Sequence, residues 1–275
     1  MTARTAGFLA LALALSGAGT AAAQSDYTGP WERGSLQLGG FISTTNSEFQ
    51  LNSETLGAGA VVDLENGLGI EADYRSFRAD AFYRTGQSRR HQWELHYYES
   101  NRDGERVLDQ DYQIGDTVFT AGTGVTSNLD LWFANANYSY AFLQDDRVRL
   151  SGSVGVHTTG IKFEVSAPGL GEEAESVTAP LPVLGARFDV VLSERWRFKS
   201  SLDVFYLAFD NYRGALLDSS LAVEYLAFKN VGFGLGFNAV RYRVEADEEG
   251  GLGGEWNGEI RYDFAGALLY AKLYF

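Results

Sequence analysis

Cysteine is missing from this chain of 275 residues, and only four residues are proline. Without cysteine the chain forms no disulfide, has no catalytic thiol and cannot hold a metal through thiolates, which excludes the small disulfide-stabilised domains. The scarcity of proline beside 32 glycines argues against a proline-rich linker and favours many strands joined by tight turns. We therefore expect one all-β unit that is stabilised by hydrogen bonding and packing.

Positive charge is also in short supply. Against 36 aspartates and glutamates stand 22 lysines and arginines, for a formal net charge of -14, so phosphate would repel the chain and nucleic acid is excluded as a partner. After residue 23 no apolar run reaches the ~18 residues that a transmembrane helix needs. Yet 45% of the residues are hydrophobic and 14% are aromatic. Helical membrane spans are excluded, and the apolar residues need another explanation.

The first 23 residues have the layout of a secretory signal peptide. Arg4 stands in a short cationic start, an apolar stretch runs over 6–15, and Ala21 and Ala23 supply the small residues of a cleavage site. The apolar stretch is too short for a membrane anchor. We predict an exported protein with a signal peptide over 1–23, a periplasmic N-terminal segment over 24–33 and a single β domain over 34–275.

Hydrophobicity alternates with period two along several segments, as it does in strands whose successive side chains point to opposite faces of a sheet. In the segment 214–228, one face carries Leu217 and Leu221 and the other carries Asp218 and Glu224. The same alternation recurs over 132–140, 184–190, 196–206 and 231–238. A strand with one apolar face and one polar face is expected in the wall of a barrel that has lipid outside and a polar lumen inside.

The end of the chain carries a family resemblance. A terminal Phe275 behind alternating apolar residues resembles the C-terminal signature of Gram-negative outer-membrane β-barrels, with Leu273 standing where an aromatic residue is common. The resemblance implies a protein of the bacterial outer membrane, surrounded by lipid and lipopolysaccharide. It also implies an assembly signal for the insertion machinery of that membrane, made of Leu269, Ala271, Leu273 and Phe275.

A second stretch resembles a little-characterised, porin-like group of these barrels. It is the segment 77–104, "FRADAFYRTGQSRRHQWELHYYESNRDG", which resembles a hairpin that recurs in the group, together with "DLENGLG" at 63–69. The group brings no established activity with it.

A β-protein that spans lipid must satisfy every backbone polar group internally, so its sheet closes on itself. We predict a closed antiparallel transmembrane β-barrel over 34–275, with short periplasmic turns and long extracellular loops. Short polar links are expected at 85–90, 143–147, 192–195 and 228–230, and long ones at 101–127, 164–180 and 245–257. These links give about ten strands. The segment 49–76 leaves the number open, since it forms either an extra hairpin, for twelve strands, or an ordered extracellular excursion.

Charged residues occupy the predicted inward face of this wall. Buried charges persist only when they are paired. The inward charges therefore either fill the lumen with a structural lattice or line a narrow polar path for small solutes or cations. The predicted lumen-lining residues are Arg78, Asp80, Arg84, Glu94, His96, Arg149, His157, Arg187, Asp189, Arg197, Lys199, Asp203, Asp218 and Glu224.

Aromatic residues near strand ends are expected to form girdles at the two membrane interfaces. The expected girdle residues are Trp93, Tyr97, Tyr98, Trp132, Trp196, Tyr262 and Tyr270.

Two other functions stay open. Ser151 or Ser153 with His157 and a nearby acid would supply the groups of a hydrolase at the barrel rim. Because the chain has many serines, such a set of residues is expected to occur by chance. We therefore predict no catalytic residue.

Acidic clusters over 172–175 and 247–249 fall in predicted extracellular loops, where they suit solvation or a surface interaction. They lack the spacing of a calcium loop, so we predict no metal site and no cofactor. The sequence leaves the oligomeric state undetermined.

Overall fold

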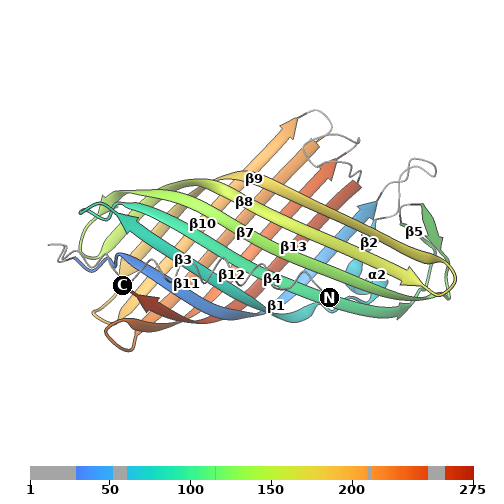
Figure 1. The fold of residues 1–275 in the computed structure, drawn as a ribbon, viewed down its shortest axis with the longest axis horizontal. Coiled ribbons are helices and arrows are strands. Elements are labelled where there is room, and N and C mark those ends of the chain that lie inside the picture. Colours follow the sequence, from blue (N-terminus) through green and yellow to red (C-terminus); the bar gives the residue numbers. More distant parts are fainter. Residues whose placement is uncertain (1–28, 52–60, 115, 210–211, 247–257) are drawn as a thin grey trace, which may run out of the picture.

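The computed structural model describes residues 29–51, 61–114, 116–209, 212–246 and 258–275. Within this part of the chain, ten long antiparallel strands follow one another around a barrel, and the two-residue β2 pairs with β1 (Figure 1). The predicted signal peptide lies outside the described residues. The elements are β1 Gly34–Leu51, β2 Val62–Asp63, α2 Leu64–Leu68, β3 Asp73–Thr85, β4 His91–Val107, β5 Tyr112–Ile114, β6 Thr117–Phe119, β7 Gly124–Gln144, β8 Val148–Ala167, β9 Gly171–Val191, β10 Trp196–Phe209, β11 Tyr212–Leu226, β12 Val231–Ala246 and β13 Gly258–Tyr274.

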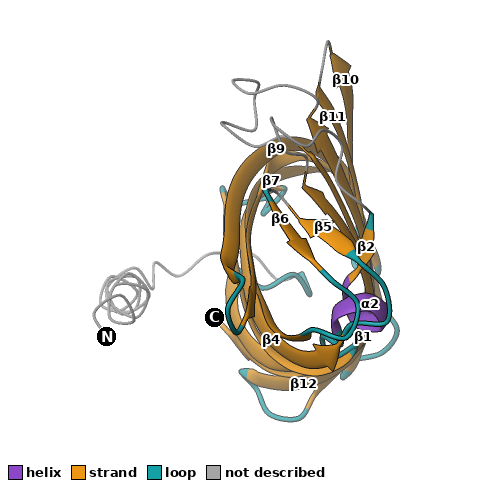
Figure 2. Ribbon diagram, turned by 90° about the vertical axis from the view of Figure 1, so that its right-hand side faces the viewer, coloured by secondary structure: helices purple, strands orange, loops and turns teal. Residues whose placement is uncertain are grey.

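The last strand closes the barrel on the first. β13 pairs with β1 along its whole length, from Ser35↔Tyr274 to Leu51↔Gly258. At the end of this ladder Gly34 N–H donates to Phe275 O at 2.9 Å, and Phe275 N–H donates to Gly34 O at 3.0 Å. Figure 2 shows the resulting ring of strands. The predicted closed barrel of about ten strands is confirmed, and the twelve-strand alternative is wrong.

The two ends of the barrel differ in their connections. The short links that join β3 to β4, β7 to β8, β9 to β10 and β11 to β12 all lie at one end, the short-turn end, together with Gly34 and Phe275. The opposite end, the long-loop end, holds α2 and the hairpin of β5 and β6 (Figure 2). Among the described residues no helix is long and apolar enough to cross a bilayer.

Within the described part of the segment 49–76, local capping holds the short helix α2. The Asp63 side chain accepts the N–H of Asn66 at 2.8 Å and so caps α2. Gly69 ends the helix in the left-handed region, at φ 74°. Gly104 of β4 lies against this turn, and a Cβ on Gly104 would stand 2.6 Å from backbone atoms of Gly69 and Ile70. The helix therefore packs directly on the wall.

One of the predicted long loops is wrong. Between residues 164 and 180 the chain continues as strand, and β8 and β9 meet at a three-residue turn over 168–170. Gly169 and Gly171 have φ values of 83° and 98°, which allow so tight a turn. The acidic residues Glu173 and Glu175 therefore belong to β9 and not to a loop. The second acidic cluster, 247–249, lies outside the described residues.

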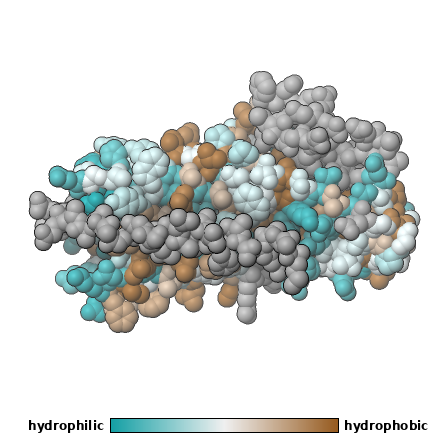
Figure 3. All heavy atoms as spheres, in the orientation of Figure 1, coloured by the Kyte–Doolittle hydropathy of each residue, from teal (hydrophilic) through white to brown (hydrophobic). Residues whose placement is uncertain are grey.

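The outer surface of the wall changes character along each strand. On β12 the outward residues Phe233, Leu235 and Phe237 lie nearer the short-turn end and are about half exposed or more, whereas Arg241 and Arg243 follow toward the long-loop end. Figure 3 shows many hydrophobic side chains left of the middle of the wall, between hydrophilic ones at the left-hand, short-turn edge and further hydrophilic ones toward the long-loop end. The part with the apolar exterior is called the membrane half, and the part toward the long-loop end is called the outer half.

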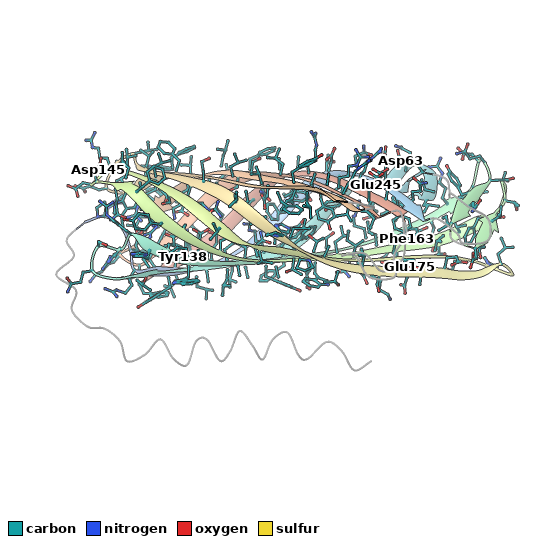
Figure 4. All side chains as sticks on the ribbon, turned by 90° about the horizontal axis from the view of Figure 1, so that it is seen from above. Asp63, Tyr138, Asp145, Phe163, Glu175 and Glu245 are labelled. Carbon is teal, nitrogen blue, oxygen red and sulfur yellow. The ribbon has the colours of Figure 1, made fainter. Side chains whose placement is uncertain are left out.

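The interior changes in the opposite sense. Inward residues of the membrane half are largely charged, whereas the outer half contains a hydrophobic core. On β12 the inward residues of the outer half are Val240, Tyr242 and Val244, all at most 3% exposed. In Figure 4, Phe163 and Glu245 lie in this half, far from Asp145 at the short-turn end. The barrel thus has the polarity of a membrane protein over one half and of a water-soluble barrel over the other.

The aromatic girdle is only partly as expected. Trp93, Tyr97, Trp132 and Trp196 are exposed on the outer face of the wall. The expectation was wrong for three tyrosines that point inward and are buried, namely Tyr98, Tyr262 and Tyr270.

Candidate functional site in the barrel lumen

All fourteen predicted lumen residues lie on inward-facing positions, where they are buried or line the lumen cavity. Eleven of them line one cavity of about 140 Å³, and Arg149, His157 and Arg197 are the three that do not. Lys272, Tyr270 and Asn238 also line the cavity and were missed from the sequence. The period-two alternation that points Leu273 and Phe275 outward also points Lys272 inward, so the signal for this residue was present.

An arginine crosses the lumen between two carboxylates. Arg187 of β9 donates to Glu94 of β4 at 3.0 Å, and both its terminal nitrogens donate to Asp203 of β10, each at 2.9 Å. A Cβ on Gly185 would lie 2.0 Å from Asp203 Oδ1, so the missing side chain leaves room for this carboxylate. The two-pronged geometry is the strongest form of the arginine–carboxylate pair.

His96 joins this cluster to a second one. Its Nδ1 lies 2.6 Å from Asp80 Oδ1, and its Nε2 lies 3.5 Å from Glu94 Oε2. Asp80 also accepts from Arg78 Nε at 2.8 Å and from Gln37 Nε2 at 2.6 Å. Neighbouring inward charges are therefore paired from strand to strand around the wall.

A third cluster surrounds Glu224 of β11. The carboxylate accepts from Tyr270 at 2.9 Å, from Lys272 at 2.8 Å and from Tyr274 at 2.7 Å, and Lys199 Nζ stands 3.1 Å away. Glu224 is 2% exposed. Because one acid has two lysines and two hydroxyls as neighbours, its charge is fully compensated.

The chain before β1 lies across the short-turn end of the lumen. Trp31 is buried, and its indole N–H donates to Asp145 O at 2.7 Å. The backbone oxygen of Glu32 accepts from Arg84 at 2.9 Å, and the Glu32 carboxylate pairs with Arg197. Arg84 and Arg197 belong to β3 and β10, which are not neighbours in the sheet. Trp31 and Glu32 therefore form a plug, called the N-terminal plug.

Aromatic rings close the lumen on the other side of the cavity. Phe41 packs edge-on against Phe264 at 5.2 Å between ring centroids, and Tyr98 stacks on Phe133 at 4.3 Å. These rings, with Tyr262, form the aromatic layer. Beyond them the core of the outer half includes buried residues of α2, β5 and β6. Along the barrel, the cavity therefore lies between the N-terminal plug, which contacts its lining residue Arg84, and the aromatic layer, where Phe41 lies beside its lining residue Arg78.

The groups considered for a hydrolase do not come together. His157 is 1% exposed, and neither of its ring nitrogens has a hydrogen-bond partner among the described residues. The hydroxyls of Ser151 and Ser153 are likewise without partners there. His91 points outward, with its Nδ1 2.6 Å from the Tyr138 hydroxyl. Within the described part of the chain, no three acidic or histidine side chains are grouped to hold a metal.

The residues of the predicted assembly signal share the outer face of β13. Leu269 is 68% exposed, Leu273 49% and Phe275 53%, and Ala271 lies in the same row. This is a lipid-facing row in the membrane half.

Comparison with known proteins places the fold. No protein-family model matches the sequence, and no curated protein matches it. The outer membrane protease OmpT from Escherichia coli is similar in structure with a TM-score of 0.55 and 8% identity, over 88% of this chain and 96% of that one. The transport unit of the autotransporter AIDA-I from E. coli has a TM-score of 0.43 and 10% identity over 98% of both chains. The toluene transporter TodX of P. putida has a TM-score of 0.35 and 10% identity, over 88% and 90%. At these identities the likeness to OmpT shows the fold and no activity.

Proposed function

We propose that this chain, which has the fold of the outer-membrane β-barrel proteins, is a sealed structural barrel and not an open pore. The observation that supports this most is that the N-terminal plug lies across the short-turn end of the lumen and the aromatic layer packs across it on the other side of the cavity. A cavity of about 140 Å³ holds several water molecules.

The pairing of the lumen charges supports the same role. Carboxylates that face the cavity, such as Asp80, Glu94 and Glu224, each have a cationic side chain within 3.0 Å. A wall that placed its charges to select ions would leave some of them available to the passing ion. Glu94 and Glu224 pair with cations of other strands, Arg187 of β9 and Lys272 of β13. Asp80 pairs with Arg78 of its own strand and also with His96 of β4, so these contacts link the strands of the wall.

The test is bilayer conductance of the purified, refolded protein. The wild-type chain is expected to show the heat-modifiable migration of a folded barrel and no discrete current steps. Steady steps from the wild-type protein would overturn the sealed-barrel proposal.

A narrow channel is the second candidate, and the polar cavity favours it. If the protein is a channel and the N-terminal plug is its gate, the double variant Trp31→Ala, Glu32→Ala opens the short-turn mouth, and current steps appear that the wild type lacks. If the barrel is sealed, as we propose, the aromatic layer keeps the double variant closed and no current steps appear. Glu194→Ala, in the exposed turn over 192–195, is the matched control because it removes an acid from the same end without touching the plug.

We also propose that the protein is not an enzyme. We further propose that its C-terminal strand directs assembly of the barrel into the membrane. Phe275→Ser is expected to lower the fraction of the protein that reaches the heat-modifiable folded form in cells. The control is Phe228→Ser, because Phe228 is an aromatic residue of similar exposure, 68%, in a short turn. Equal loss in both variants would show that an exposed aromatic residue matters, and not the terminal one.

A further inference from the structure

The wall of the outer half is open along one line. β9 and β10 pair from Arg197↔Val191 to Val204↔Leu184 and no further among the described residues. Yet β9 extends over 171–183 and β10 over 205–209 beyond this point. Figures 1 and 2 show β10 diverging from β9 toward the long-loop end. This unpaired line between the two strands is called the seam.

Two of the four prolines explain why the ladder ends there. Val191 N–H donates to Arg147 O on the β8 side, and Leu192 N–H donates to Trp196 O on the β10 side. Backbone N–H groups alternate along a strand, so even-numbered residues of β9 direct theirs toward β10. Pro180 and Pro182 are even-numbered and have no N–H to give. The ladder with β8 continues past both, at Thr158↔Pro180 and Val156↔Pro182.

The residues along the seam are uncharged and largely apolar on both sides. No charged side chain occurs over 176–184 or over 204–208. Leu184 and Tyr206 are exposed by 63% and 77% on the outer face. Behind them, Phe205 and Leu207 are only partly buried against the hydrophobic core of the outer half. The seam therefore joins the lipid-facing surface to an apolar interior.

We propose that the seam admits an acyl chain of a membrane lipid, which lies against the core of the outer half between β9 and β10. A lipid is the neighbour that the lipid-facing surface already provides at Leu184 and Val204. Because the prolines present no N–H donors, an entering hydrocarbon leaves fewer backbone groups unsatisfied there. A peptide strand adding to this edge needs those donors. Entry requires Phe205 and Leu207 to turn aside, which their partial burial makes easier than for a fully packed residue.

The experiment uses the absence of cysteine, which makes any introduced cysteine a unique labelling site. Three Ala→Cys variants are labelled with bimane and refolded into phosphatidylcholine vesicles with brominated acyl chains, which quench the dye on contact. Ala179→Cys places the dye inside, behind the seam, Ala141→Cys places it inside elsewhere, and Ala271→Cys places it on the lipid face. The expected result is full loss of fluorescence at Ala271, a clear partial loss at Ala179, where only an acyl chain inside the seam can reach the dye, and none at Ala141.

Two further arms decide the interpretation. The double variant Pro180→Thr, Pro182→Thr restores both donors and is expected to close the seam and reduce quenching at Ala179, whereas Pro168→Thr in the turn over 168–170 leaves it unchanged. An Ala179 dye that bromolipids do not quench overturns the proposal, as does one quenched only by aqueous iodide. Unchanged quenching in the double-proline variant overturns the role of the prolines. None of these results depends on conductance, so the sealed-barrel proposal is tested separately.

Discussion

Four groups converge on Glu224, and this carboxylate should carry a measurable share of the stability. Glu224→Gln keeps the shape and removes the charge, which leaves the buried Lys272 and the partly buried Lys199 without their acid. Breaking a buried pair in this way costs about 3–5 kcal/mol. We expect a loss of that size in the free energy of unfolding by urea in lipid vesicles. Glu194→Gln, an exposed turn residue, is the control, and a loss below about 1 kcal/mol would contradict the paired-lattice interpretation.

Gly155 offers a test of packing at a single residue. A Cβ there would stand 1.8 Å from Asn137 Oδ1 and 2.5 Å from Ala136 O. Gly155→Ala should therefore destabilise the barrel by about 1–3 kcal/mol. On the same strand, a Cβ at Gly152 meets no described heavy atom within 4 Å, so Gly152→Ala controls for the loss of glycine. Partial rescue of Gly155→Ala by Asn137→Ser would identify the amide as the clashing group.

At the residue scale, the alternation of apolar and polar residues predicted which side of the wall a side chain faces wherever the two faces of the strand differed in polarity. It placed Asp218 and Glu224 in the lumen because Leu217 and Leu221 on the other face are clearly apolar. It failed for Tyr98 and Tyr262, which are amphipathic and suit either a membrane interface or a buried core. Their strand neighbours Glu99 and Asp263 are charged and face outward. This inversion of the two faces in the outer half was not anticipated, so the tyrosines were assigned to the wrong side.

At the scale of the element, the turn between β7 and β8 should be sensitive to pH. Asp145 Oδ1 accepts the N–H groups of Arg147 and Val148, both at 2.7 Å, and these bonds hold the pKa of the carboxyl below its ordinary value. A lowered folded-state pKa stabilises the fold above the unfolded-state pKa, and the contribution disappears as pH falls through the folded value.

We therefore expect wild type to exceed Asp145→Asn in unfolding free energy at neutral pH and the difference to shrink toward zero in acid. The measurement is urea unfolding at a series of pH values. Asp146→Asn is the control, because Asp146 accepts neither bond. A difference that does not change with pH would mean that the turn does not depend on the charge.

Turn chemistry explains which elements could be predicted. The short links were found from polar and turn-forming residues between alternating segments, and the observed turns lie within or beside them. The turn over 168–170 was hidden, because the acidic residues after it resemble a solvated loop although they continue as β9. The seam was also missed, since the effect of Pro180 and Pro182 depends on which neighbour their nitrogens face. Whether these nitrogens face β8 or β10 is set by how the strands pair in three dimensions, and the spacing of the two prolines does not reveal it.

At the scale of the whole molecule, the reversal of polarity makes a prediction that no single element makes. Arginine placed on the lipid face of a membrane barrel costs about 2–4 kcal/mol at the bilayer midplane and about 0–1 kcal/mol near the interfaces. Along the outer face of β12, Leu235→Arg should therefore be costly, Ala239→Arg nearly neutral, and removal of charge by Arg243→Leu tolerated.

The inner face of the same strand should respond in the opposite order. Val244→Arg, in the core of the outer half, should destabilise strongly because the charge is buried without a partner, whereas Asn238→Arg, beside Asp218, should cost less. Urea unfolding of the five variants in lipid vesicles gives the two profiles. Profiles that run in parallel on both faces would mean that the membrane covers the outer half as well. Crossing profiles would locate the membrane boundary between Phe237 and Arg241, where the side chains on the surface change from aromatic to charged.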